Sequence, residues 1–210
     1  MDASVNDSDK ERALSLCPRL QGIRHELETY EDLLLRWQKK INLIGPSTVQ
    51  SVWTRHFADS AQLAEFCPER ASWADLGSGA GFPGIVISLL QKSLSIGGEM
   101  HVIESDSRKA AFLREVSRET GAGAVVHHTR CEDILPTLSP SVITSRAMTG
   151  LARLIELSRE HVENGAIALF LKGRDIDVEL TSAPISSNFS IELFQSRVDP
   201  GGNVIRISVR

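Results

Sequence analysis

One glycine-rich stretch holds the residue types best suited to binding a small ligand: Asp75-Leu76-Gly77-Ser78-Gly79-Ala80-Gly81-Phe82-Pro83-Gly84. Four of its last eight residues are glycines, and glycine tolerates a positive φ and has no Cβ to hold a ligand away from the backbone. The run at 71–74 before it indicates the approach of a buried strand, and residues 85–90 after it continue as a helix. Strand, glycine loop and helix in this order bring backbone N–H groups and a positive helix end close to a ligand.

The loop fits two binding motifs. Gly79-x-Gly81-x-x-Gly84 matches the dinucleotide fingerprint, which alone is a weak signal and would indicate a nicotinamide-dependent oxidoreductase. The other frame, Asp75-x-Gly77-x-Gly79-x-Gly81, resembles motif I of the S-adenosylmethionine-dependent methyltransferases. That cofactor is a sulfonium with an amino acid tail and no pyrophosphate, so a nearby carboxylate suits its cationic part. We favour the second frame, which assigns Asp75, Gly77, Gly79 and Gly81 to cofactor binding.

Polar residues also follow the next predicted strands, where an open parallel sheet binds its ligands. Glu104 closes the strand predicted at 100–104, and its carboxylate can accept both hydroxyls of an adenosine ribose. Cys131 and Glu132 follow the strand predicted at 124–128, where methyltransferases of this class contact the adenine edge. Arg130 and Cys131 could equally be loop residues without a ligand role.

The strand predicted at 142–145 ends in Ser145-Arg146-Ala147. The sequence lacks an N-P-P-Y or D-P-P-Y signature, used for exocyclic amino groups, and a Pro-Cys dipeptide that would attack cytosine C5. The expected acceptor is therefore already nucleophilic, as guanine N7 is, and needs alignment more than acid–base help. Arg146 is the predicted catalytic residue, because a guanidinium holds base acceptors or phosphate well. A salt bridge closing the strand end is its alternative role.

The surrounding pattern predicts an α/β fold. From residue 71 strands alternate with helices, with further strands at 166–171, 191–198 and 204–209 and helices at 107–120, 149–161 and 175–180. Asp199-Pro200-Gly201-Gly202 marks a hairpin between the last two strands. The prediction is a Rossmann-like class I methyltransferase domain at 71–210, with a mostly parallel sheet and a C-terminal antiparallel hairpin.

Residues 1–70 are predicted to be a helical extension packed with that domain as one compact unit. One continuous helix is expected from an apolar stripe with alternating spacings of three and four: Leu20, Ile23, Leu27, Tyr30, Leu34, Trp37 and Ile41. The pattern stops at Asn42-Leu43-Ile44-Gly45-Pro46. A second helix capped by Ser47-Thr48 and further helical turns are expected to reach Phe66.

Composition indicates an ordinary soluble chain: 210 residues, 41% hydrophobic and 24% charged, with a formal net charge of −4. No apolar run approaches the roughly 18 residues of a membrane span, and the N-terminus lacks signal-peptide features. The three cysteines are far apart and form no C-x-x-C pair, which argues against disulfides and a zinc site. We therefore expect a cytoplasmic monomer with no metal and no membrane partner.

Seven motifs in order resemble the RsmG (GidB) family of bacterial methyltransferases from about Leu20 onward. They are Trp37-Gln38-Lys39-Lys40-Ile41-Asn42-Leu43, Arg55-His56-Phe57-Ala58-Asp59-Ser60, the stretch at 75–84, Ile103-Glu104-Ser105, Arg108-Lys109-Ala110-Ala111-Phe112-Leu113-Arg114, Ser145-Arg146-Ala147 and Leu171-Lys172-Gly173.

The resemblance implies methylation of N7 of a guanine in 16S ribosomal RNA with S-adenosyl-L-methionine as cofactor. It also implies cofactor contacts at Gly77, Phe82, Glu132 and Arg146, at Cys131 through its backbone, and at Glu104 on the ribose. The family often has Asp where Glu104 stands. A non-catalytic RNA-binding protein that has kept the fold is a third possibility.

The charge distribution suggests where RNA would bind. Residues 33–60 hold four basic side chains and one acidic one, whereas residues 1–32 hold eight acidic and four basic ones. A basic face that meets 16S rRNA or the small ribosomal subunit is therefore predicted from Arg36, Lys39, Lys40 and Arg55, with Lys172 at the opposite rim. A solvated helix face is the alternative. His56, which lies in the motif at 55–60 that resembles the family, is a further candidate to shape the site or the RNA face, with a structural role at a helix end as its alternative.

Overall fold

The computed structural model describes residues 3–67 and 70–210. Its centre is a seven-stranded sheet in the order β3-β2-β1-β4-β5-β7-β6, in which β7 is antiparallel to β5 and to β6 and the other pairs are parallel. The strands are β1 Trp73–Leu76, β2 Met100–Glu104, β3 Val125–His128, β4 Val142–Arg146, β5 Ile167–Lys172, β6 Phe189–Gln195 and β7 Asn203–Val209. The predicted α/β fold with its C-terminal hairpin is confirmed.

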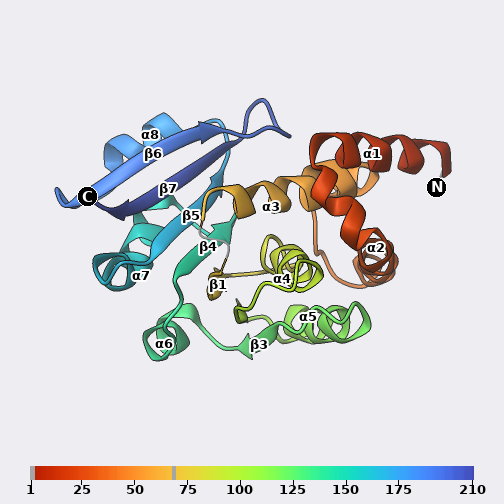
Figure 1. Ribbon diagram of the computed structural model, residues 1–210, viewed down its shortest axis with the longest axis horizontal. Helices are drawn as coiled ribbons and strands as arrows, with labels where there is room; N and C mark the ends of the chain where they lie inside the picture. The colour runs from red at the N-terminus through yellow and green to blue at the C-terminus, as the bar shows by residue number, and fades with distance from the viewer. Residues whose placement is uncertain (1–2, 68–69) are drawn as a thin grey trace.

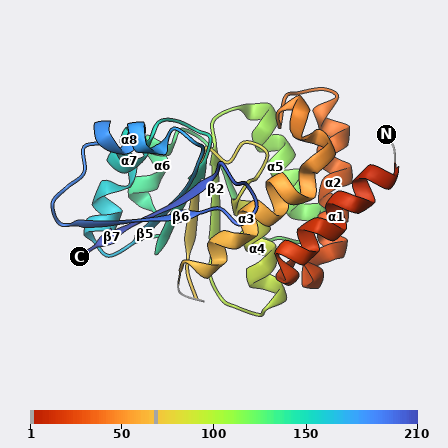
Figure 2. The ribbon, with the colours of Figure 1, turned by 90° about the horizontal axis from the view of Figure 1, so that it is seen from above.

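Helices cover both faces of the sheet (Figures 1 and 2). The α-helices are α1 Ala3–Leu16, α2 Arg24–Gln38, α3 Asp59–Ala61, α4 Gly84–Ser93, α5 Ser107–Glu119, α6 Cys131–Ile134, α7 Leu151–Glu163 and α8 Ile176–Ser182. α4 and α5 lie on one face, and α6, α7 and α8 lie on the other (Figure 2). The N-terminal helices pack outside α4 and α5, so the molecule has an extra helical layer on that side only.

The register of β1 brings the functional strand ends together. Leu76, the last residue of β1, pairs with Ile103 of β2 on one side and with Ser145 of β4 on the other. Because these strands are parallel, the loops that follow them leave from the same edge of the sheet. The glycine loop is therefore flanked by Glu104 and Arg146.

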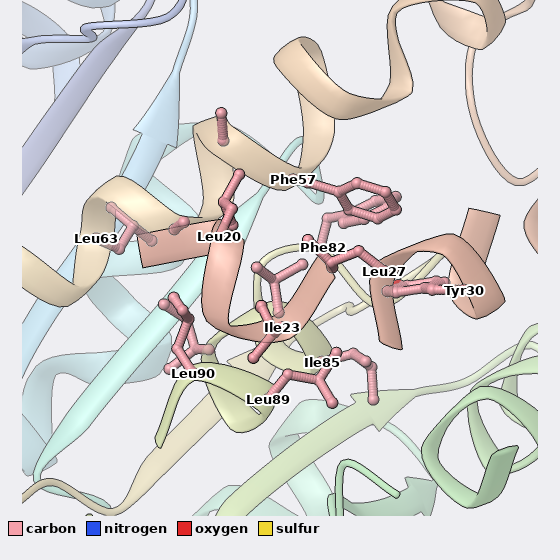
Figure 3. Packing of buried hydrophobic residues seen from close by; sticks show 14 of the residues in the cluster. Leu20, Ile23, Leu27, Tyr30, Phe57, Leu63, Phe82, Ile85, Leu89 and Leu90 are labelled. Carbon is pink, nitrogen blue, oxygen red and sulfur yellow. The ribbon is translucent and has the colours of Figure 1, made fainter. Parts of the chain in front are cut away.

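The N-terminal helices share one hydrophobic core with the sheet layer (Figure 3). The Tyr30 ring stacks on Phe82 of the glycine loop with centroids 5.3 Å apart, and Phe57 packs against both rings. The buried Tyr30 hydroxyl donates a hydrogen bond to the backbone carbonyl of Ala80. The helical layer therefore supports the glycine loop directly, through an aromatic cluster and one polar contact.

The N-terminal region differs from the predicted elements in two places. The apolar stripe is not one helix: a 3₁₀ segment, Pro18–Ile23, leads into α2, which ends at Gln38. The Gln38 side chain then accepts hydrogen bonds from the backbone N–H groups of Leu43 and Ile44, which turns the chain sooner than the stripe suggested. α1 was not predicted, because its sequence has no apolar stripe. Tertiary contacts hold it instead, with the Asp9 carboxylate accepting from the backbone N–H of Trp53 at 2.9 Å.

Residues 46–65, between α2 and β1, are helical, as predicted, but their helical geometry varies. A 3₁₀ segment, Pro46–Ser51, is followed by a π-helical stretch, Trp53–Ala58, then by α3 and a last 3₁₀ turn, Gln62–Glu65. π-helical turns occur frequently at functional sites. Here the stretch carries Arg55 and His56 to the carboxyl edge of the sheet.

Within residues 3–67 and 70–210, no helix combines the length and apolarity needed to cross a membrane.

Candidate active site

A cleft of about 510 Å³ opens beyond the carboxyl ends of β1, β2 and β4. Seven of the nine residues predicted to bind the cofactor line it: Gly77, Gly79, Phe82, Glu104, Cys131, Glu132 and Arg146. They come from four successive strand ends, as the sheet topology requires. Asp75 and Gly81 do not line the cleft.

Glu104 and the glycine loop are joined by hydrogen bonds. The backbone N–H of Gly79 donates to Glu104 Oε2 at 2.9 Å, and the backbone N–H of Asp106 donates to Glu104 Oε1 at 2.8 Å. Gly79 has φ of 56°, a backbone conformation that glycine adopts most readily. Each carboxylate oxygen keeps a second lone pair, so Glu104 can still accept hydroxyl groups from a ligand in the cleft.

Asp75 points away from the cleft, which corrects its predicted contact with the cationic part of a ligand. Its side chain is 0% exposed, and its Oδ2 accepts a hydrogen bond from the backbone N–H of Gly84 at 3.1 Å. Burial raises the pKa of this carboxyl group to about 7. Asp75 therefore ties the glycine loop and the first turn of α4 to the end of β1.

Gly81 faces the hydrophobic core rather than the cleft, so its predicted cofactor contact is also not what the structure shows. A Cβ at this position would lie 2.8 Å from Ile85 Cγ1 and 3.0 Å from Leu113 Cδ2, and it would also meet the Tyr30 hydroxyl. With φ of 90°, the residue is a glycine for reasons of packing and backbone conformation.

The side of the cleft formed by α6 carries more positive charge than the sequence prediction assigned. Glu132 is exposed and forms an ion pair with Arg153 of α7 at 2.5 Å. Lys109, Arg130 and Arg153 all line the cleft and were not predicted. Their nearness in sequence to Glu104, Cys131 and Arg146 was one available signal, and Lys109 also lies in the motif at 108–114. The Cys131 thiol is buried, and burial raises its pKa to about 11, so it is an uncharged part of the wall.

Arg146 closes one end of the cleft and is held by three partners. Its Nη1 donates to the backbone carbonyl of Arg55 at 3.0 Å and lies 3.5 Å from Asp59 Oδ2. Its Nη2 contacts His56 Nδ1. The guanidinium carbon lies 5.1 Å from the centre of the Phe82 ring, a cation–π arrangement. Arg146 thus makes the predicted strand-end ion pair, but it remains on the wall of the cleft.

His56 supports Arg146 as a neutral ring. A guanidinium can only donate, so His56 Nδ1 must accept, which places the ring proton on Nε2 facing Thr48 Oγ1 at 2.9 Å. The ring stacks on Phe82 with centroids 4.9 Å apart. Burial, Arg146 and Arg55 lower the His56 pKa to about 2. His56 is thus a buried, uncharged group at 6% exposure beside Arg146.

A second cavity, of about 470 Å³, lies on the other side of Arg146. It shares Leu43, Arg146 and Ala147 with the cleft, so these residues form a common wall. Ala147 has φ of 55°, an uncommon conformation for a residue with a Cβ. Backbone of this kind often occurs at ligand sites. The remaining wall of the second cavity comes from segments around Thr48, His56, Lys172, Glu179 and Asp199.

The six residues predicted to bind RNA fall into two groups. Arg36, Lys39 and Lys40 are exposed near the end of α2, shortly before Leu43 enters the common wall. Arg55, by contrast, pairs with Asp199 at 2.6 Å, and Lys172 pairs with Glu179 at 2.7 Å and is only 10% exposed. Together with His56, these two line the second cavity, and the Arg55 side chain is 42% exposed. The carboxylates that neutralise them were not predicted, because they are distant in sequence.

No group of three or more His, Cys, Asp and Glu side chains is arranged to hold a metal ion in the part of the chain that the structure describes.

Solved structures with the same fold include methyltransferases of low sequence identity. A methyltransferase from Geobacter sulfurreducens matches with a TM-score of 0.58 and 10% identity over 88% of this chain and 90% of that one. A SAM-dependent methyltransferase from Aquifex aeolicus matches with a TM-score of 0.57 and 14% identity over 79% of this chain and 94% of that one. At these identities, the likeness shows the fold alone.

Relatives in sequence are more specific. The chain is 48% identical over 183 residues to a ribosomal RNA small subunit methyltransferase G from Rhodospirillum centenum, covering 87% of this chain and 82% of the relative. It is 42% identical over 207 residues to the protein of that name from Bradyrhizobium sp. strain BTAi1, covering 98% of this chain and 93% of the relative. The family model described as rRNA small subunit methyltransferase G (GidB) matches residues 23–199. The chain therefore belongs to the family of small-subunit ribosomal RNA methyltransferase G.

Proposed function

We propose that this protein transfers a methyl group from S-adenosyl-L-methionine to N7 of a guanine in 16S ribosomal RNA. The observation that carries the proposal is the junction at Arg146. A cleft with the cofactor-binding features of a methyltransferase and a second cavity large enough for a base meet at this side chain. Family membership supplies the class of RNA substrate.

The residues of the cleft fit this cofactor. Glu104 is placed to accept ribose hydroxyls, and the backbone around Cys131 and Glu132 lies where the adenine edge is expected. The half-buried backbone of Gly77 and Gly79, which lines the cleft, allows close approach of the amino acid tail. When bound, the cofactor supplies a methyl group on a positively charged sulfur, and the guanine N7 lone pair forms the new bond as the thioether leaves.

Guanine N7 carries no proton, so this reaction needs no general base. The groups around the common wall agree with that requirement. His56 is neutral, and both of its ring nitrogens already have partners, Arg146 and Thr48. Asp59 faces the Arg146 guanidinium and also accepts from Gln62 and Ser196. Arg146 is therefore proposed to orient the base rather than to move a proton.

A nicotinamide-dependent oxidoreductase is a poorer fit, for a physical reason. A dinucleotide places its pyrophosphate at the N-terminus of the helix that follows the glycine loop. In this chain the first N–H of α4, that of Gly84, is hydrogen-bonded to the Asp75 carboxyl group. An acidic side chain at that position would repel a pyrophosphate rather than attract it.

Lys39 and Lys40, with Arg36, are proposed to contact RNA phosphates as the target approaches the common wall. Their exposure and their position just before Leu43 support this role. We further expect the protein to act in the cytoplasm as a monomer, on 16S rRNA either free or within the small subunit.

Mass-spectrometric mapping of 16S rRNA would test the proposed function. Ribosomal RNA from a deletion strain is expected to lack one 7-methylguanosine that reappears on complementation. Calorimetric titration of the purified protein is expected to detect S-adenosylhomocysteine and no NAD. An unchanged modification map, or tight binding of NAD alone, would overturn the assignment.

A further inference from the structure

The second cavity is acidic, although it belongs to a protein proposed to bind RNA. Its lining holds four carboxylates, Asp59, Asp175, Glu179 and Asp199, but three cations, Arg55, Arg146 and Lys172. His56 adds no charge, because its pKa is about 2. Each cation already faces a carboxylate of the same lining. A phosphate group would therefore meet net repulsion in this cavity, whereas a base edge that carries N–H donors would find acceptors.

Hydrogen-bond donors are concentrated at the common wall. The Arg146 guanidinium has five N–H donors, and no acceptor for its Nε is found among the described residues. In guanine the group next to N7 is the O6 acceptor, whereas in adenine it is an amino donor. A purine whose N7 lies toward the cofactor cleft would thus place guanine O6, but not the adenine amino group, favourably beside Arg146.

Acceptor capacity remains on the part of the lining that the cleft does not share. Asp199 is bonded to Arg55 and to the backbone N–H of Gly201. Glu179 is bonded to Lys172 and to the backbone N–H of Leu151, the first residue of α7. Asp175, just before α8, is exposed and forms no ion pair or side-chain hydrogen bond with any residue between 3 and 67 or between 70 and 210. Both bonds of Glu179 go to its Oε2, so one of its oxygens also stays open. Of the four carboxylates, Asp175 is the one with both oxygens free of partners among the described residues, as a paired N1–H and N2 amino edge requires.

We propose that the second cavity receives the target guanine with O6 beside Arg146 and with its N1–H and N2 amino edge on the Asp175 carboxylate. This placement of the guanine rests on the proposed function. A guanine held in this way has donors where the cavity has acceptors and acceptors where it has donors. The site rejects adenine at both edges and pyrimidines by the absence of N7. Asp175 is thus a specificity-determining residue for the base.

Replacing the target guanine by inosine tests this assignment, because inosine lacks only the N2 amino group. The two RNAs are methylated in parallel by the wild-type protein, Asp175→Asn and the matched control Asp177→Asn. Asp177 is exposed on the same helix and does not line the cavity. Methylation at N7 is read by nucleoside mass spectrometry, and S-adenosylhomocysteine affinity is measured for all three proteins.

The wild-type protein is expected to prefer guanine over inosine by about tenfold in kcat/KM, the effect of one hydrogen bond to a charged acceptor. Asp175→Asn should reduce that preference to within about threefold, with unchanged cofactor affinity, while Asp177→Asn keeps it. An undiminished preference in Asp175→Asn, an equal loss in Asp177→Asn, or no preference in the wild type would overturn the proposal. Failure of the proposed function would appear separately, as absence of N7 methylation of the guanine RNA by the wild-type protein.

Discussion

The two cavities that meet at Arg146 are built by different means. The cofactor cleft is made of successive strand ends and of backbone N–H groups, with Gly79 and Glu104 joined across one loop. The second cavity is closed by side-chain ion pairs between segments far apart in the chain, such as Arg55 with Asp199 and Lys172 with Glu179. In the proposed function, recognition of the cofactor is thus a local property of the βα units, whereas recognition of the acceptor requires the N-terminal helices and the C-terminal hairpin to be assembled.

Arg146 belongs to both cavities, so its replacement should have the largest effect on activity. Arg146→Lys keeps the charge but loses the planar fork that meets His56 and the Arg55 carbonyl. We expect kcat/KM for RNA to fall by about 100-fold or more, with a much smaller loss of S-adenosylhomocysteine affinity. Calorimetry and methylation assays on the same preparation separate the two. Equal losses of kcat/KM and of S-adenosylhomocysteine affinity would show that Arg146 acts only through cofactor binding.

Two glycines of one loop distinguish the folded core from the cleft. Gly81→Ala forces a Cβ against Ile85 and Leu113 at a positive φ, and should lower the free energy of unfolding by about 2–4 kcal/mol. In Gly79→Ala the added Cβ has room, because its nearest neighbour is the Gly77 carbonyl oxygen at 3.8 Å. This substitution should lower the free energy of unfolding by about 1 kcal/mol. Its larger effect should be weaker cofactor binding. Urea denaturation and calorimetry of both variants provide the measurement; the reverse ranking of stabilities would contradict the orientation of the loop.

Replacing His56 tests whether methylation of the acceptor depends on the contact between His56 and the Arg146 guanidinium. His56→Phe can keep the ring stack on Phe82 but removes the Nδ1 acceptor, so we expect kcat to fall about tenfold with little change in the KM for cofactor. Thr48→Val, which leaves the Nδ1 acceptor in place and removes the partner of Nε2 together with a hydrogen bond to the Gly45 carbonyl, should have a smaller effect. Because the His56 pKa is about 2, the ring stays neutral from pH 5.5 to 8. The pH profiles of wild type and His56→Phe should therefore be parallel; a limb near pH 6.5 present only in the wild type would contradict a neutral ring.

Replacing the exposed lysines should change RNA binding alone, and it should have the smallest effect of these substitutions. Lys39→Ala combined with Lys40→Ala is expected to weaken RNA binding about three- to tenfold and to reduce the salt slope by roughly two, one per lost phosphate contact. The defect should be largest at low salt, because the wild type loses more affinity as salt rises. A control with Arg12→Ala and Arg118→Ala removes two exposed charges from α1 and α5. If the control variant weakens RNA binding equally, the effect of the lysines is one of net charge and not of phosphate contacts at this surface.

Much of the fold could be predicted from sequence because it rests on local patterns. The strand at 100–104, the helix from Ser107 and the hairpin around Asp199-Pro200-Gly201-Gly202 all follow from hydrophobic period, caps and turn residues within a few positions of one another. α1 lacks such a pattern, and its docking depends on Asp9 reaching Trp53 across 44 positions. Propensity over a short window carries no information about that contact.

The candidate site also has a part that local sequence patterns predict and a part that depends on tertiary contacts. Residue types and spacing placed Gly77, Gly79, Glu104 and Arg146 at one edge of the sheet, and the family resemblance added Phe82. All five line the cleft, since parallel strands bring consecutive loop residues to one edge. Packing alone turned Asp75 and Gly81 inward, neutralised His56 and paired Arg55 and Lys172 with carboxylates. Direction, burial and charge compensation of a side chain depend on neighbours that are remote in sequence. For that reason the cofactor cleft could be read from the motifs, while the shape and acidity of the second cavity emerged only when the chain was folded.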